Sequence, residues 1–159
     1  MADLSTTYMG VKLKNPLILG ASNLVSKPES IKEIEEAGIG AIVYRSLFEE
    51  QIQLENLQMD EDLSEYENRN AEMTNLFPGL EHAGPKEHLY NVEKLKKSVE
   101  VPVFASLNAI YEPTWVEYAK ELEKTGVDGL EINLYAVPGY FEVSGQSVEE
   151  KQVQIVKAV

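Results

Sequence analysis

Short apolar runs recur along the chain, and longer amphipathic segments separate them. Four of these runs end on a polar residue or just before one, at 17–21, 41–45, 102–106 and 128–133. Runs of this kind are typical of strands that are buried on both faces of a parallel sheet. Parallel α/β proteins place functional groups at the carboxyl ends of their strands, so the pattern predicts a polar site where these runs end.

The segments between the runs carry helix signals. Ser26, Pro28 and Glu29 predict a capping box at the start of one helix, and Gly38 is placed to end it. Further helices are predicted near 48–58, over 89–99 and over 113–126. Strands that alternate with helices in this way predict an α/β fold.

The two ends of the chain predict a hairpin and a last helix. Residues 6–14 alternate partly and contain Gly10 at a turn, which predicts a β-hairpin before the first core strand. Ser147 and Glu150 predict a second capping box, which opens a helix with Val153 and Val156 on its apolar side.

The spacing of the strand ends predicts a repeated unit of about 25 residues, which suits a (β/α) repeat. A complete (β/α)₈ barrel needs eight strands and typically about 250 residues. The predicted fold is therefore the N-terminal (β/α)₄ half of a TIM (β/α)₈ barrel, preceded by the hairpin. Residues 1–159 are expected to form one such half of a single domain, with an acidic insertion at 49–85 after the second strand.

Composition narrows the function classes. The formal net charge of −13 argues against nucleic acid as a partner, because binding it relies on Lys and Arg. Nine acidic residues lie within 49–72 and are expected to form a solvated helical face. The chain has no cysteine, no apolar stretch that approaches about 20 residues, and no signal-peptide pattern. We expect a cytoplasmic protein with no membrane contact.

The strand ends offer neutral polar groups and one fixed charge. Ser22, Ser46, Ser106, Asn108 and Asn133 supply hydroxyls and amides, and Arg45 supplies the cation. This set suits a planar heterocycle with several carbonyl and N–H groups. A triad hydrolase would require a histidine, and the two in the sequence, His82 and His88, lie outside the predicted strands.

Several of these segments resemble one enzyme family. Residues 4–16, the Ala21-Ser22-Asn23 run, and residues 45–52, 101–108 and 130–134 are similar to class 1 dihydroorotate dehydrogenases. The resemblance covers about half of such an enzyme. It implies a TIM-barrel flavoprotein that binds FMN at the barrel mouth and oxidises dihydroorotate to orotate in pyrimidine biosynthesis.

The resemblance also implies roles for individual residues. It places Ala21 and Ser22 against the isoalloxazine ring, and it places Ser46 beside Arg45. Arg45 stands where the family has a lysine, near the N1–C2 carbonyl edge of the flavin, and a cation there stabilises reduced flavin. Asn108 and Asn133 would bind the flavin or hold the carbonyl and amide groups of the substrate.

One position departs from the family pattern. Class 1 enzymes carry a cysteine as proton acceptor three residues after the last of these asparagines, where this chain has Ala136. Ser144 and Tyr135 are the candidates to replace it. Two alternatives stay open: a related flavoprotein with a different substrate, and a non-catalytic half-barrel that pairs through its sheet edges with a second copy or another chain. The expected partners are a dihydroorotate-like small molecule and a homo-oligomer or a complementing half.

Overall fold

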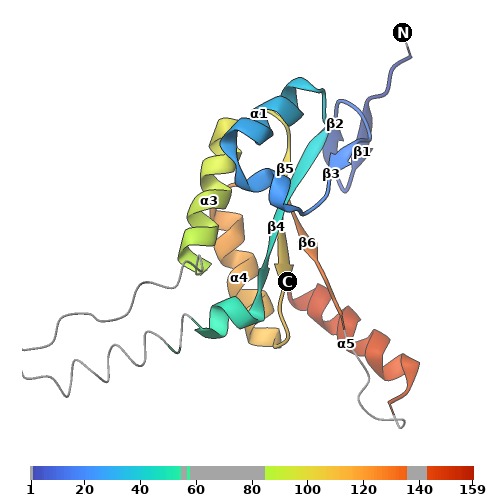
Figure 1. The fold of residues 1–159 in the computed structure, drawn as a ribbon. Helices are drawn as coiled ribbons and strands as arrows, with labels where there is room; N and C mark the ends of the chain where they lie inside the picture. The colour runs from blue at the N-terminus through green and yellow to red at the C-terminus, as the bar shows by residue number, and fades with distance from the viewer. Residues whose placement is uncertain (1, 55–56, 58–84, 136–142) are drawn as a thin grey trace, which may run out of the picture.

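The computed structural model describes residues 2–54, 57, 85–135 and 143–159. It is a mixed α/β fold in which strands and helices alternate along the chain (Figure 1). The elements are β1 (Thr6–Tyr8), β2 (Val11–Leu13), β3 (Ile18–Leu19), η1 (Asn23–Ser26), α1 (Pro28–Glu36), β4 (Ala41–Phe48), α3 (Pro85–Ser98), β5 (Val103–Asn108), α4 (Glu112–Lys124), β6 (Gly129–Ile132) and α5 (Gly145–Ala158).

Two sheets are present in the described residues. β1 and β2 form an antiparallel hairpin with Thr6 opposite Leu13. β3, β4, β5 and β6 form a parallel sheet in sequential order. The turn of the hairpin holds Met9 and Gly10 at φ of 50° and 83°, the left-handed region that glycine tolerates best. The predicted hairpin and the predicted parallel α/β sheet are both confirmed.

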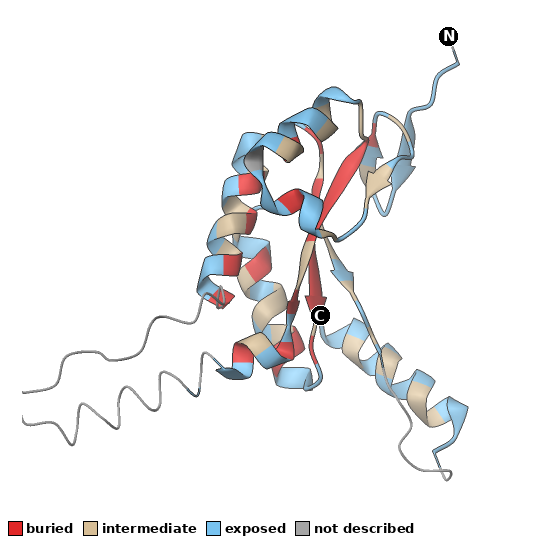
Figure 2. Cartoon of the chain, viewed as in Figure 1, coloured by how far each residue is buried: buried red, intermediate tan, exposed pale blue. Residues whose placement is uncertain are grey.

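The main core lies between the sheet and helices α1, α3 and α4, which cover one face of the sheet (Figure 1). Ile42, Leu47, Leu107 and Trp115 are fully buried in it. Figure 2 shows that burial concentrates along β4 and β5, whereas the hairpin and α5 are mostly exposed. The apolar runs identified in the sequence therefore form the centre of the sheet.

A second, smaller core lies on the opposite face of the sheet, beneath the hairpin. Leu13 of the hairpin packs with Ala41, Val43 and Phe104. The Tyr8 ring meets the Phe104 ring edge-on, with centroids 6.4 Å apart. The hairpin thus covers the amino-terminal part of this face and leaves the carboxyl ends of the strands accessible. We call this face the hairpin-side face.

A β-bulge interrupts the pairing of β4 with β5. Val43 pairs with Phe104 but Ser46 pairs with Ser106, so β4 has one residue more than β5 over this interval. Before the bulge Val43 belongs to the hairpin-side core, and after it Leu47 belongs to the helix-side core. The extra residue therefore turns Ser46 onto the hairpin-side face, because side chains alternate along a strand.

Several predicted boundaries were wrong. The first core strand is only Ile18–Leu19, because the chain turns into η1 at Asn23. Lys27 is the N-cap residue of α1, and it makes no side-chain capping bond, so the predicted cap at Ser26 does not form. Strands β4 and β5 extend to Phe48 and Asn108, so Ser46 and Ser106 lie within strands.

The helix stops were predicted better than the helix starts. Gly38 and Gly126 follow α1 and α4 with φ of 94° and 80°, as expected for glycines that end helices. The N-cap residue of α5 is Ser144, not Ser147, and the Ser144 hydroxyl accepts a hydrogen bond from the Ser147 N–H at 3.2 Å. Val153, on the predicted apolar side of α5, is half exposed, and Ile155 packs against the core instead.

The helices in the described part of the chain are all too short or too polar to cross a lipid bilayer. The predicted helix near 48–58 is confirmed over residues 49–54, which are helical. Most of the predicted 49–85 insertion lies outside the described residues.

Candidate functional site

An open hollow of about 290 Å³ lies at the carboxyl ends of β3 and β4. It is lined by Ala21, Ser22, Asn23, Arg45, Ser46, Phe48 and Gln51. We call it the strand-end hollow. Ala21, Ser22, Arg45 and Ser46 are four of the residues that the sequence singled out for a flavin, and the fold brings them together although they come from two segments of the chain.

The Ser22 hydroxyl is placed to bind a ligand. Ser22 precedes η1, and its side chain makes no capping bond to that helix. Its Oγ is buried and has no hydrogen-bond partner within the described residues. A buried hydroxyl without a partner is costly, so a ligand atom in the hollow would relieve this cost.

Arg45 contributes positive charge to the same hollow. It also acts on its neighbours on the helix side, where the Tyr44 and His88 rings meet edge-on with centroids 5.2 Å apart. Burial, together with the smaller effect of the Arg45 charge, lowers the pKa of His88 to about 4. Burial raises the pKa of Tyr44, while the charge and hydrogen bond of Arg45 oppose this rise. His88 and Tyr44 are thus both uncharged near pH 7, and Arg45 carries the charge.

A row of polar side chains crosses the hairpin-side face below the hollow. Ser46, Ser106 and Glu131 occupy matching positions on β4, β5 and β6. The Ser46 and Ser106 hydroxyl oxygens are 2.7 Å apart, and Ser106 donates to the Glu131 Oε1 at 2.8 Å. Ser106 is 0% exposed, so this predicted strand-end residue is a buried connector and not a direct ligand of the hollow.

The two predicted asparagines lie at the ends of the next strands. Asn108 ends β5 and pairs with Phe48. The Asn133 N–H donates to the Leu107 carbonyl at 3.1 Å, which places Asn133 beside the end of β5. Both asparagines therefore lie at the carboxyl edge of the sheet, but neither lines the strand-end hollow.

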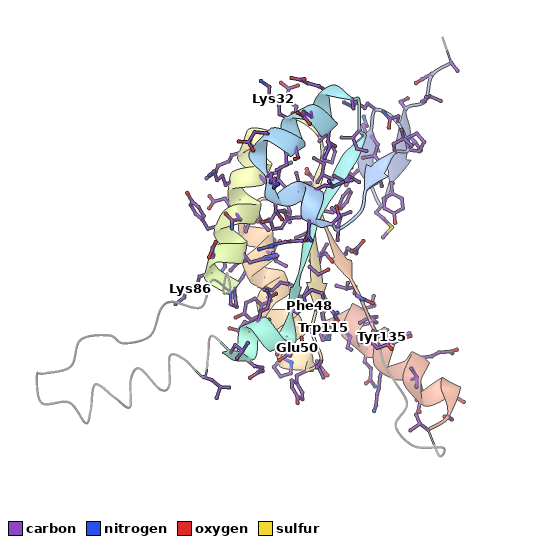
Figure 3. The ribbon with its side chains drawn as sticks, in the orientation of Figure 1. Lys32, Phe48, Glu50, Lys86, Trp115 and Tyr135 are labelled. Carbon is purple, nitrogen blue, oxygen red and sulfur yellow. The ribbon has the colours of Figure 1, made fainter. Side chains whose placement is uncertain are left out.

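The candidate proton acceptors are less well placed. Tyr135 is 77% exposed and lies just beyond the end of β6 (Figure 3). Ser144 is the N-cap residue of α5, where its hydroxyl already accepts a backbone hydrogen bond. Ala136, the position of the family's cysteine, lies outside the described residues.

Glu49 is a structural residue that the sequence reasoning missed. It was grouped with the solvated acids of the insertion, yet its side chain is only 2% exposed. Its carboxylate accepts hydrogen bonds from the Ile110 N–H at 3.0 Å, the Thr114 hydroxyl at 3.1 Å and the Gln53 amide at 2.7 Å. Glu49 thereby ties the end of β4 to the segment that joins β5 and α4 and to the first turn of α4. Its position directly after a buried strand was the available signal.

A larger hollow, of about 570 Å³, lies on the helix side between α1 and α3. Tyr44 and Arg45 reach it, but its other walls are helix side chains such as Val25, Lys32 and Leu95. It lies away from the carboxyl edge of the sheet, where parallel α/β proteins carry their sites. We therefore assign the candidate site to the smaller strand-end hollow.

Comparison with known proteins agrees with the sequence resemblance. The chain is 27% identical over 135 residues to the catalytic subunit of dihydroorotate dehydrogenase B (NAD(+)) from Thermoplasma volcanium. It is 28% identical over 134 residues to the protein of the same name from Thermoplasma acidophilum. Each match covers 84% of this chain and 42% of the relative, so the chain spans less than half the length of these relatives. No protein-family profile matches the sequence. Over most of its length, the chain is similar to dihydroorotate dehydrogenases.

Proposed function

We propose that this chain is part of an FMN-dependent oxidoreductase of the dihydroorotate dehydrogenase type, acting on a CH–CH bond. The observation that carries the proposal is the strand-end hollow. Residues that the sequence analysis assigned to a flavin converge there around the Arg45 guanidinium and the Ser22 hydroxyl, which has no partner among the described residues. The similarity to dihydroorotate dehydrogenases supports the same proposal.

The residues of the hollow fit one edge of a flavin ring. That edge presents a carbonyl, an N–H and a second carbonyl in a row, so it needs donors on both sides of an acceptor. Arg45 has several N–H donors and a fixed positive charge, and the Ser22 hydroxyl, which has no partner in the described part of the chain, can donate. When bound, FMN supplies a two-electron acceptor for the oxidation of a CH–CH bond.

The remaining polar residues of the carboxyl edge are proposed to hold the substrate. The Asn108 and Asn133 amides can each donate and accept, which matches the alternating carbonyl and N–H groups of a dihydropyrimidine ring. Arg45 would stabilise the negative charge that develops on the N1–C2 carbonyl edge of the flavin when the flavin is reduced. Of the two candidate proton acceptors we favour Tyr135, because the Ser144 hydroxyl is engaged as a helix cap.

The sequential parallel order of β3 to β6 is the order that strands follow in a (β/α)₈ barrel. We propose that these strands form one part of such a barrel, with the strand-end hollow at its mouth. A barrel of this kind carries its ligand at the carboxyl ends of the strands, where the hollow lies.

The test is flavin binding by the protein expressed from its complete reading frame. We expect a yellow protein, and bleaching of its visible absorption when dihydroorotate is added without oxygen. Arg45→Gln should weaken FMN binding by about tenfold or more, since a charge-assisted hydrogen bond is lost. Arg45→Lys, which restores the residue of the related family, should retain most of the affinity.

Lys32→Gln is the matched control, because Lys32 is an exposed lysine on α1 that does not line the hollow (Figure 3). It removes the same unit of charge and should leave FMN affinity unchanged. A colourless protein that ignores FMN would refute the proposal. Equal losses in the Arg45 and Lys32 variants would refute the assignment of the site.

A further inference from the structure

The polar row below the hollow has a fixed hydrogen-bond direction. Glu131 is exposed and its carboxylate can only accept, so Ser106 must donate its single hydroxyl proton to it. Ser106 then has only lone pairs left for its other neighbour. Since the Ser46 and Ser106 oxygens are 2.7 Å apart, Ser46 must be the donor of that bond.

This hydrogen-bond direction determines whether Ser46 can donate or accept a hydrogen bond in the strand-end hollow. With its proton committed to Ser106, the Ser46 hydroxyl presents only lone pairs to a ligand. Ser106 is fully buried, so water does not compete for its proton and the order is maintained. A ligand group that meets Ser46 therefore has to donate a hydrogen bond.

We infer that Glu131 is a positioning residue that acts through Ser106 and makes Ser46 an obligatory acceptor, so that the hollow selects a ring that carries an N–H between its carbonyls. The inference rests on the proposed flavin site. It adds a selection rule: Arg45 and Ser22 bind the carbonyls, and Ser46 reads the N–H between them. Glu131 itself touches no ligand in this scheme.

The experiment compares FMN with 3-deaza-FMN, in which a C–H group of nearly the same size replaces that N–H. The wild-type protein should bind FMN about tenfold more tightly, because the analogue leaves the Ser46 lone pairs unpaired. Ser46→Ala should abolish this preference.

Glu131→Lys reverses the row, because a lysine can only donate to Ser106 and Ser106 must then donate to Ser46. The preference for FMN should disappear or invert in this variant. Glu131→Gln keeps an acceptor next to Ser106 and should retain the preference. The ratio of the two affinities cancels general changes in stability or charge, so a merely structural role of Glu131 would not alter it.

A second measurement does not depend on flavin. Ser106 is buried, so its hydroxyl proton should exchange slowly and be visible by NMR. We expect a nuclear Overhauser contact from this proton to the Glu131 side-chain methylenes and not to the Ser46 methylene. The opposite contact would overturn the inference even if flavin binds, and so would an unchanged affinity ratio in Glu131→Lys. Absence of flavin binding with the expected NMR contact would refute the proposed function and leave the acceptor role of Ser46 supported.

Discussion

Replacing Glu49 with alanine should destabilise the protein strongly, although the residue lies in the most acidic part of the sequence. Glu49 is buried and accepts three hydrogen bonds, one from Ile110 in the segment between β5 and α4 and one from Thr114 in the first turn of α4. The substitution leaves the Ile110 N–H and the Thr114 hydroxyl without their acceptor and removes a side chain that fills space.

The magnitude follows from the two long-range bonds. A hydrogen bond to a charged group contributes about 1.5–3 kcal/mol, so losing both should cost about 3 kcal/mol or more. The bond from Gln53 is left out, because that amide can turn to water. For a chain of this size such a loss lowers the melting temperature by about 6–12 °C.

Urea unfolding measures this directly through the fluorescence of Trp115, the single tryptophan of the sequence. Trp115 is 1% exposed and follows Thr114 in α4, so it reports on the segment that Glu49 holds (Figure 3). Glu50→Ala is the matched control, because Glu50 is the neighbouring acid and is exposed. Surface substitutions usually change stability by less than about 0.5 kcal/mol.

A double-mutant cycle separates the bond from the packing. Thr114→Val removes the hydroxyl and keeps the shape, and combining it with Glu49→Ala should show a coupling of about 1.5 kcal/mol. A loss below about 1 kcal/mol in Glu49→Ala would contradict the reasoning, and so would equal losses in the Glu49 and Glu50 variants.

Three further results are expected. Burial lowers the pKa of His88 from its ordinary 6.5 to about 4, so the unfolded chain takes up the proton first as the pH falls. The stability that neutral His88 provides is complete above about pH 6.5, and about 3 kcal/mol of the free energy of unfolding is lost between pH 6.5 and pH 4. In His88→Phe the free energy of unfolding should depend less steeply on pH over this range. An unchanged pH dependence would contradict the low pKa of His88. Gly40→Ala should cost more than about 2 kcal/mol, because its Cβ would lie 2.2 Å from the Asn15 carbonyl oxygen. Gly20→Ala, with no atom within 4 Å of the added carbon, should stay within about 1 kcal/mol in the same urea titration, and equal losses would argue against the close approach. Ser144→Ala should lower stability by about 1 kcal/mol through loss of the α5 cap, and an equal effect of Ser147→Ala would favour the cap predicted from sequence.

The order of the elements was predictable because it depends on local patterns. Buried strands need continuous apolar runs, and helices that end at glycine need a residue that tolerates positive φ, as Gly38 and Gly126 do. The hollow could also be anticipated, since the carboxyl ends of neighbouring parallel strands meet at one edge. Ala21, Ser22, Arg45 and Ser46 were found in this way.

What the sequence could not give depends on contacts between distant segments. The burial of Glu49 requires donors from Ile110 and Thr114, about 60 positions away, so its charge alone suggested an exposed residue. The Ser46–Ser106–Glu131 row depends on register across three strands. A capping box is a local pattern too, but Ser26 is the last residue of η1, and Lys27 is the N-cap residue of α1 instead.

The bulge in β4 has a consequence for comparing this chain with its relatives. Position-by-position alignment assumes that equivalent residues face the same way, and one extra residue in a strand breaks that assumption for everything downstream in it. In a relative that pairs these strands without the bulge, an alignment without gaps would match the residue opposite the Ser106 position with Arg45 and not with Ser46. Ligand-facing positions after Val43 can therefore be transferred between chains only where a gap is allowed at Tyr44–Arg45. Deleting one residue there would remove the bulge and keep Ser46 opposite Ser106, whereas an alignment without a gap would exchange the serine of the hollow for the neighbouring position of the strand.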